Sequence, residues 1–156
     1  MRHVSIVTTL VLVLGAPALW AQRMTPTTPG TAGDPQWQAL VRLSDGRTFL
    51  TDGGMAIDAV VAKLAKLPEK EYPGKVIETY LTAPHQQEYG FADLKATASG
   101  KAYDTPIGIP LNATYINYLR RVLPVAATRF RLSSESQPVV IMVGGKAVGV
   151  LMPVRK

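Results

Sequence analysis

Few side chains in this sequence could take part in catalysis or hold a metal ion. Its 156 residues contain no cysteine and two histidines, His3 and His85. The lack of cysteine excludes disulfides, thiolate nucleophiles and cysteine-based zinc sites, and a pair of histidine ligands cannot form if His3 is removed with a leader. A Ser-His-Asp arrangement would have to use His85, but no nucleophile-elbow sequence is present. We therefore predict no catalytic residue, no metal and no cofactor, and expect His85 in a surface loop.

Three aspartates and one glycine-rich segment also have the residue types of functional sites. Asp45, Asp52 and Asp58 follow one another closely, but each stands where aspartate commonly serves a turn or a helix cap. The segment 144–149, GGKAVG, has the composition of a phosphate-binding loop. It lies between two predicted strands, and no helix follows it to hold an anion. We interpret it as a hairpin turn at Gly144 and Gly145.

The elements that must position these residues indicate one α+β domain. Hydrophobic residues make up 47% of the chain, which suits a globular core. Periodicity predicts strands at 38–43 and 48–51, a helix at 56–67 and strands at 75–81, 89–97 and 101–111. A second helix at 114–123, capped by Asn112, precedes strands at 128–132, 138–143 and 147–154. The prediction is two β-α-β-β-β repeats with antiparallel sheets and two helices on one face.

The N-terminal residues are typical of an export signal. A short basic start precedes an apolar run of about 13 residues, shorter than the ~20 that a membrane-spanning helix needs. We predict a signal peptide at 1–21, a flexible linker rich in proline, glycine and threonine at 22–36, and a folded domain at 37–156. The alternative is a cytoplasmic chain whose translation starts at Met24.

Positive charge is concentrated in the last third of the chain. Residues 22–104 carry nine basic and ten acidic side chains, whereas residues 105–156 carry seven basic side chains and one acidic one. Arg120 and Arg121 on the second predicted helix, with Lys63 and Lys66 on the first, could form a basic face for nucleic acid. The alternative is that these charges only keep two solvated helix faces soluble.

The last third of the chain resembles a known family. The segment 107–119, IGIPLNATYINYL, is similar to the helix entry of the C-terminal domain of the bacterial DNA polymerase III beta sliding clamp. The strand at 129–132, the Pro138-Val139 strand start and the closing Met152-Pro153-Val154-Arg155 follow at similar spacing. This resemblance covers about 50 residues and implies a clamp-like domain, a duplicated β-α-β-β-β unit whose helices face DNA.

The resemblance also implies a peptide-binding groove between the start of the second helix and the C-terminal strand. The matching positions are Asn112, Tyr115, Pro138, Val150, Met152, Pro153, Val154 and Arg155. An apolar cleft with a few polar anchors suits peptide capture, and flexible methionine suits varied partners. The alternative is that Val150, Met152 and Val154 form one face of an ordinary core strand. Ser136 stands where the family usually has an apolar groove residue.

Two functional hypotheses follow. The first is a non-enzymatic binding module, with short peptide motifs of protein partners in the groove and double-stranded DNA on the basic helices. The second is a periplasmic or secreted protein that uses the clamp-like fold only as a scaffold. One such domain is too small to encircle a duplex unless it forms a homo-oligomer.

Overall fold

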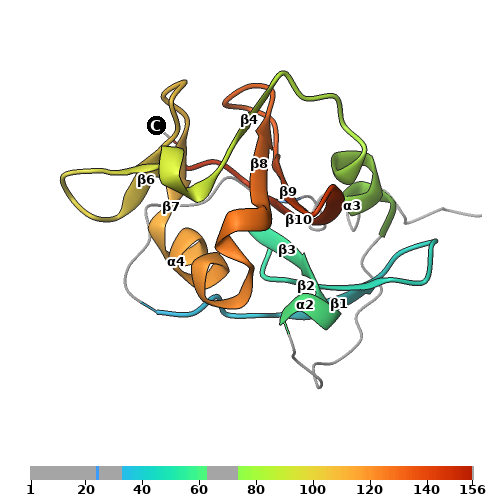
Figure 1. Ribbon diagram of the computed structural model, residues 1–156. Helices are drawn as coiled ribbons and strands as arrows, with labels where there is room; N and C mark the ends of the chain where they lie inside the picture. Colours follow the sequence, from blue (N-terminus) through green and yellow to red (C-terminus); the bar gives the residue numbers. More distant parts are fainter. Residues whose placement is uncertain (1–23, 25–32, 63–73, 156) are drawn as a thin grey trace, which may run out of the picture.

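The computed structural model describes Met24, residues 33–62 and residues 74–155. The predicted signal peptide, most of the predicted linker and residues 63–67 of the first predicted helix lie outside these residues. The described chain folds as a mixed α+β domain with a seven-stranded sheet, a three-stranded sheet and three α-helices (Figure 1). None of its helices has the length and apolar character needed to cross a membrane.

Both sheets are antiparallel throughout. The order of strands in the large sheet is β1 (Ala39–Arg42), β2 (Thr48–Thr51), β3 (Met55–Asp58), β10 (Lys146–Leu151), β9 (Val139–Val143), β8 (Thr128–Leu132) and β4 (Gln87–Tyr89). The small sheet is formed by β5 (Lys95–Ala96), β6 (Ala102–Asp104) and β7 (Pro110–Asn112). The pairing of β3 with β10 joins the early part of the chain to its end.

The centre of the large sheet is buried on both faces. In β9, Val139 and Ile141 belong to one apolar cluster, and Val140 and Met142 belong to a second. This alternation follows from the two-residue period of a strand, and it explains why β9 is a continuous apolar run. Gly149 in β10 allows β3 to come close, because a Cβ atom there would lie 2.7 Å from the Ala56 carbonyl oxygen.

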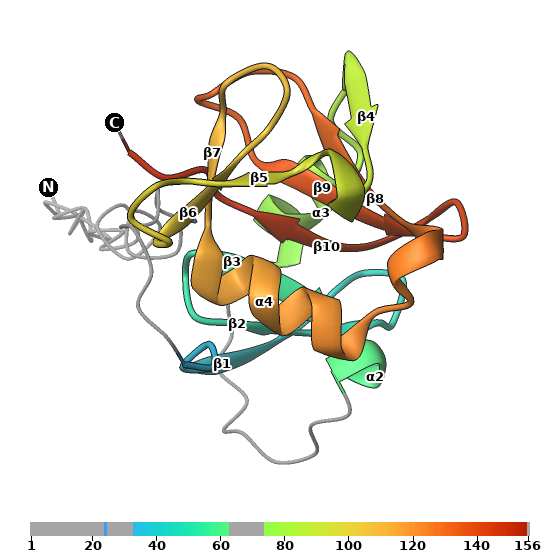
Figure 2. The same ribbon diagram turned by 60° about the vertical axis from the view of Figure 1, so that its left-hand side comes forward.

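Helices cover the two faces of the sheet. Helix α4 (Ala113–Val122) packs Ile116 and Leu119 into the first cluster, to which α2 (Ala59–Ala62) also contributes. Helix α3 (Gly74–Leu81) packs Ile77 into the second cluster. Figure 2 shows α4 in front of the sheet and α3 behind it. The sheet is therefore the middle layer, with helices on both sides.

The second half of the chain has the predicted elements. Helix α4, strands β8 to β10 and the hairpin at Gly144 and Gly145 all lie close to their expected positions. Both glycines have positive φ angles, of 57° and 82°, as a tight two-residue hairpin requires. Strands β1 and β2 also match their predictions.

The prediction of a strand at 75–81 is wrong, because these residues form helix α3. Its β-branched and aromatic residues favour a strand, but Ile77, Tyr80 and Leu81 share one side of a helix and all three contact the second cluster. This helix is an addition to the two that were expected on one face.

The first predicted helix is partly wrong. Residues 56–58 continue strand β3, where all four residues are buried, and α2 begins only at Ala59. The expected strands at 89–97 and 101–111 are broken into shorter strands, with a turn at residues 106–108 between β6 and β7. The later half thus has the order β7-α4-β8-β9-β10, whereas the earlier part has three strands before its first helix and a second helix after it.

Candidate binding pocket at the C-terminal segment

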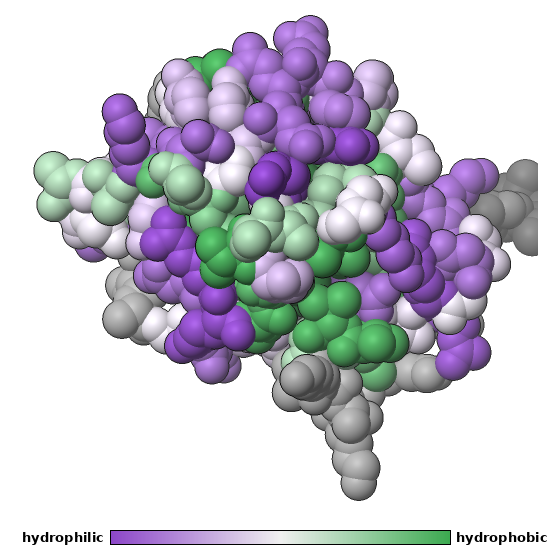
Figure 3. Space-filling model, in the orientation of Figure 1, coloured by the Kyte–Doolittle hydropathy of each residue, from purple (hydrophilic) through white to green (hydrophobic). Residues whose placement is uncertain are grey.

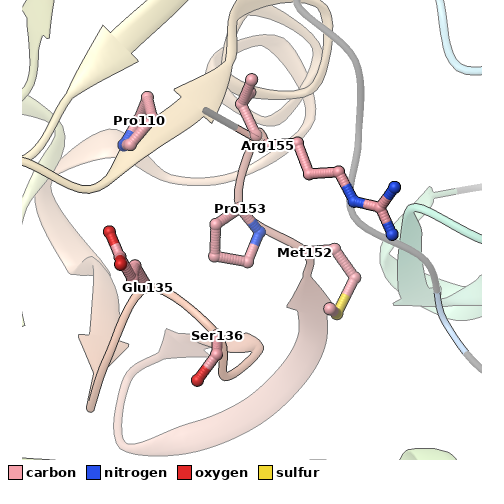
Figure 4. A pocket seen from close by; sticks show the side chains of 7 residues that line it. Pro110, Glu135, Ser136, Met152, Pro153 and Arg155 are labelled. Atoms are coloured by element: carbon pink, nitrogen blue, oxygen red, sulfur yellow. The ribbon is translucent and has the colours of Figure 1, made fainter.

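A pocket of about 320 Å³ lies beside the last described residues. Met152, Pro153, Val154 and Arg155 form one part of its lining. Figure 4 labels Met152, Pro153 and Arg155 in this part. Strand β7 contributes Pro110, and the turn between β8 and β9 contributes Glu135 and Ser136. Three separate parts of the sequence therefore meet at this pocket.

Two backbone hydrogen bonds fix the C-terminal segment after β10 ends. The Met152 N–H donates to the Gly54 carbonyl over 2.8 Å, and the Val154 N–H donates to the Pro110 carbonyl over 2.9 Å. Because Pro110 lies two residues before Asn112, the segment runs beside the strand that enters α4. This placement agrees with the one that the family resemblance implies.

The pocket combines apolar walls with charged side chains at its rim. Met152, Pro153 and Val154 are buried, so they present only part of their surface to the opening. Glu135, Ser136 and Arg155 are exposed. Such a site can accept an apolar side chain and orient it through polar contacts around the edge.

Tyr115 has a different role from the one predicted for it. Its ring is 9% exposed and its hydroxyl donates to Asp52 Oδ2 over 2.7 Å, so it links α4 to the turn before β3. Burial, followed by the hydrogen bond and the charge of Asp52, raises the pKa of Tyr115 well above its ordinary value. Tyr115 does not line the pocket.

Three other predicted groove residues also lie outside the pocket lining. The Asn112 side chain accepts the Thr114 N–H over 2.9 Å as the N-cap of α4, and Pro138 is buried. Val150 is fully buried in the second apolar cluster, as the alternative interpretation of an ordinary core strand expects. The structure brings together four of the eight predicted positions. It adds Pro110 and Glu135, which the sequence analysis missed although Pro110 is close to Asn112 in the chain.

The described arginines of the predicted basic face make contacts within the molecule. The Arg120 guanidinium donates to the Phe91 carbonyl over 3.2 Å and lies 4.9 Å from the centroid of the Tyr103 ring. Arg121 forms an exposed ion pair with Asp34. Lys63 and Lys66 lie outside the described residues.

The remaining chemistry-bearing residues have structural positions. His85 is exposed between α3 and β4. Asp45, Asp52 and Asp58 each accept at least one backbone N–H from a residue two or three positions later, which confirms their turn and cap roles. Within residues 33–62 and 74–155, no three acidic or histidine side chains are grouped so that they could hold a metal ion.

Linker residues near the domain also pack. Met24 is buried against the second apolar cluster, and Pro35 is buried as well.

Comparisons with protein families, with curated proteins and with solved structures found no match to this chain.

Proposed function

We propose that this protein is a non-enzymatic binding module with a clamp-like domain, and that it captures short peptide segments in the C-terminal pocket. The observation that carries the proposal is the meeting of Met152, Pro153, Val154 and Arg155 with Pro110 in one opening of about 320 Å³. This volume is at the lower end for ligand pockets and suits one or two side chains of a peptide.

The arrangement of the strands supports the clamp-like part of the proposal. The order β7-α4-β8-β9-β10 is one β-α-β-β-β unit, which is the unit that the sequence resemblance implies. Strand β3, which precedes the first helix, pairs with β10, the last strand of that unit. The earlier and later parts of the chain are therefore joined within one sheet.

The chemistry of the rim indicates which peptides would fit. Apolar side chains would contact Met152 and Pro153, and an acidic side chain would be attracted by the exposed Arg155 guanidinium. Binding of duplex DNA stays a prediction: Arg120 donates to the Phe91 carbonyl, Arg121 is paired with Asp34 at the surface, and Lys63 and Lys66 lie outside the described residues.

A selection of random heptapeptides on the full chain, followed by calorimetry of the enriched peptide, tests the proposal. Ser136 is exposed and lines the pocket, so Ser136→Arg should block it and weaken binding by at least about tenfold. Ser99→Arg adds the same side chain in the exposed turn between β5 and β6 and should leave binding unchanged. Failure to enrich any peptide, or equal binding by both variants, would contradict the proposal.

A further inference from the structure

The segment 34–37, which ends just before β1, is held to the domain by side chains. Figure 1 shows the blue stretch before β1 passing below α4. In the same view, Figure 3 shows hydrophilic surface on this side of the molecule, next to apolar surface around α2. Among the described residues, no hydrogen bond between backbone groups holds 34–37, and the first such bond to the sheet joins the Gln38 N–H to the Thr51 carbonyl over 2.9 Å. Such a segment can leave the surface while the sheet stays intact.

The side-chain contacts of this segment are made with α4. The Trp37 ring meets the Tyr118 ring edge to face, with 5.6 Å between the centroids and 69° between the planes. Asp34 forms an ion pair with Arg121, and these two side chains are 64% and 60% exposed. Tyr118 and Arg121 are three residues apart and therefore lie on one side of the helix. An exposed ion pair adds little stability and is screened by salt, so the contact between the rings is the main attachment.

The Tyr118 hydroxyl has no hydrogen-bond partner beneath this segment. Tyr118 is 6% exposed, and its hydroxyl oxygen is buried and unpaired among the described residues. Burial raises the pKa of Tyr118, as does the charge of Asp34, while the charge of Arg121 lowers it, so the ion pair lies near the hydroxyl. A buried hydroxyl without a partner costs free energy, because water would otherwise bind it. The observed arrangement thus contains both an attachment and a cost that opposes it.

We propose that residues 34–37 form a latch on α4, which opens while β1 stays in the sheet. Opening gives water access to the Tyr118 hydroxyl and separates Arg121 from Asp34. The open helix presents these two hydrogen-bond donors about one turn apart, whereas the closed latch covers them. The latch therefore controls access to this side of α4. It is separate from the C-terminal pocket, whose lining includes none of these residues.

The two opposing contributions predict opposite effects of two small substitutions. Tyr118→Phe keeps the ring but removes the unpaired hydroxyl, so the population of the open latch should fall at least about fivefold. Asp34→Asn removes the charge that attracts Arg121, so the open population should rise by about two- to fivefold.

Fluorine NMR on the full chain tests the latch. The sequence contains two tryptophans, Trp20 and Trp37, so Trp20→Phe with 5-fluorotryptophan labelling places one fluorine, on the Trp37 ring. Relaxation dispersion then reports exchange between closed and open states on the microsecond to millisecond timescale. The open population should grow in about 0.5 M sodium chloride, which screens the ion pair, and Asp34→Asn should abolish this salt response. A single state of Trp37 at low and high salt would overturn the proposal without reference to any variant.

Two matched controls separate the latch from general effects of the substitutions. Tyr103→Phe removes a hydroxyl that is paired, since it donates to Asn117 Oδ1 over 2.9 Å. Glu88→Gln removes the charge of another ion pair at the surface, with Arg131 over 2.7 Å. Neither change should alter the open population. The proposal is wrong if Tyr118→Phe leaves the open population unchanged or raises it, or if the controls alter it as much as the latch variants do.

Discussion

Asp52 directly follows strand β2 and Asp58 ends strand β3, and the Oδ1 atom of each accepts backbone N–H groups of the residues that come next. The two carboxylates differ in their second oxygen atom. Oδ2 of Asp52 accepts the Tyr115 hydroxyl, whereas no described residue donates to Oδ2 of Asp58. In both aspartates the first oxygen is bound by residues that follow closely in the chain, and among the described residues only Asp52 uses its second oxygen to join distant parts of the fold.

Replacing Asp52 by alanine should have the largest effect on stability. The change removes two backbone hydrogen bonds in the turn and the bond from Tyr115, leaving three donors unpaired in a partly buried region. We expect the free energy of unfolding to fall by about 2–4 kcal/mol, measured by urea denaturation at neutral pH. A loss no greater than that of Asp58→Ala would contradict the structural distinction between the two aspartates.

Replacing Tyr115 by phenylalanine should change how stability depends on alkaline pH. The folded-state pKa of Tyr115 is raised above its ordinary value of 10.0, because burial and Asp52 favour the neutral hydroxyl. The contribution of this group is therefore complete below pH 10 and is lost as the pH rises through the folded-state pKa. The loss from this one group can reach about 1.4 kcal/mol per pH unit.

Urea denaturation between about pH 9 and about pH 11 measures this difference. The variant should be less stable than the parent protein by about 1–2 kcal/mol at neutral pH, and the gap should narrow above pH 10. Tyr118, whose pKa burial also raises, is present in both proteins and cancels in the comparison. If the free energy of unfolding changes with pH in the same way for both proteins, Tyr115 ionises in the folded protein as it does in the unfolded chain.

The parts of the fold that could be predicted from the sequence have local causes. Helix α4 follows from the Asn112 cap and from the spacing of Ile116 and Leu119, and the hairpin follows from two glycines with positive φ angles. Helix α3 could not be predicted, since its residues favour a strand locally. The helix is favoured over a strand only because Ile77 packs into the second apolar cluster, on the opposite face of the sheet from α4.

The candidate pocket could be predicted in part for the same reason. Met152 and Arg155 belong to one continuous motif, so the sequence could propose them together. Pro110 reaches the pocket through its bond to Val154, a pairing that only the folded chain creates. Tyr115 was assigned to the groove, but its hydroxyl is bound to Asp52, a residue 63 positions earlier in the chain.

Asp58→Ala should destabilise the protein less than Asp52→Ala. The change removes one described hydrogen bond, which Asp58 accepts from the Val60 N–H at the start of α2. We expect a loss of about 1 kcal/mol in the free energy of unfolding at neutral pH, as for other capping residues. Asp58→Asn should lose less than this, and a loss from Asp58→Ala as large as that from Asp52→Ala would show that Asp58 makes more stabilising contacts than the one with Val60.

Asp45 gives the smallest expected effect, because its two oxygen atoms are both bound to Arg47 but lie at the surface. The Arg47 N–H and then its guanidinium lower the pKa of Asp45, so its contribution is present above the ordinary value of 3.8 and is lost as the pH falls through the folded-state pKa. Solvent screens an exposed pair of this kind. Asp45→Asn should therefore leave the thermal midpoint at neutral pH unchanged within error, and should only flatten the stability curve slightly below pH 4. A large loss of stability at neutral pH would contradict this expectation. It would show that Asp45 stabilises the fold as Asp52 and Asp58 do, despite its exposure.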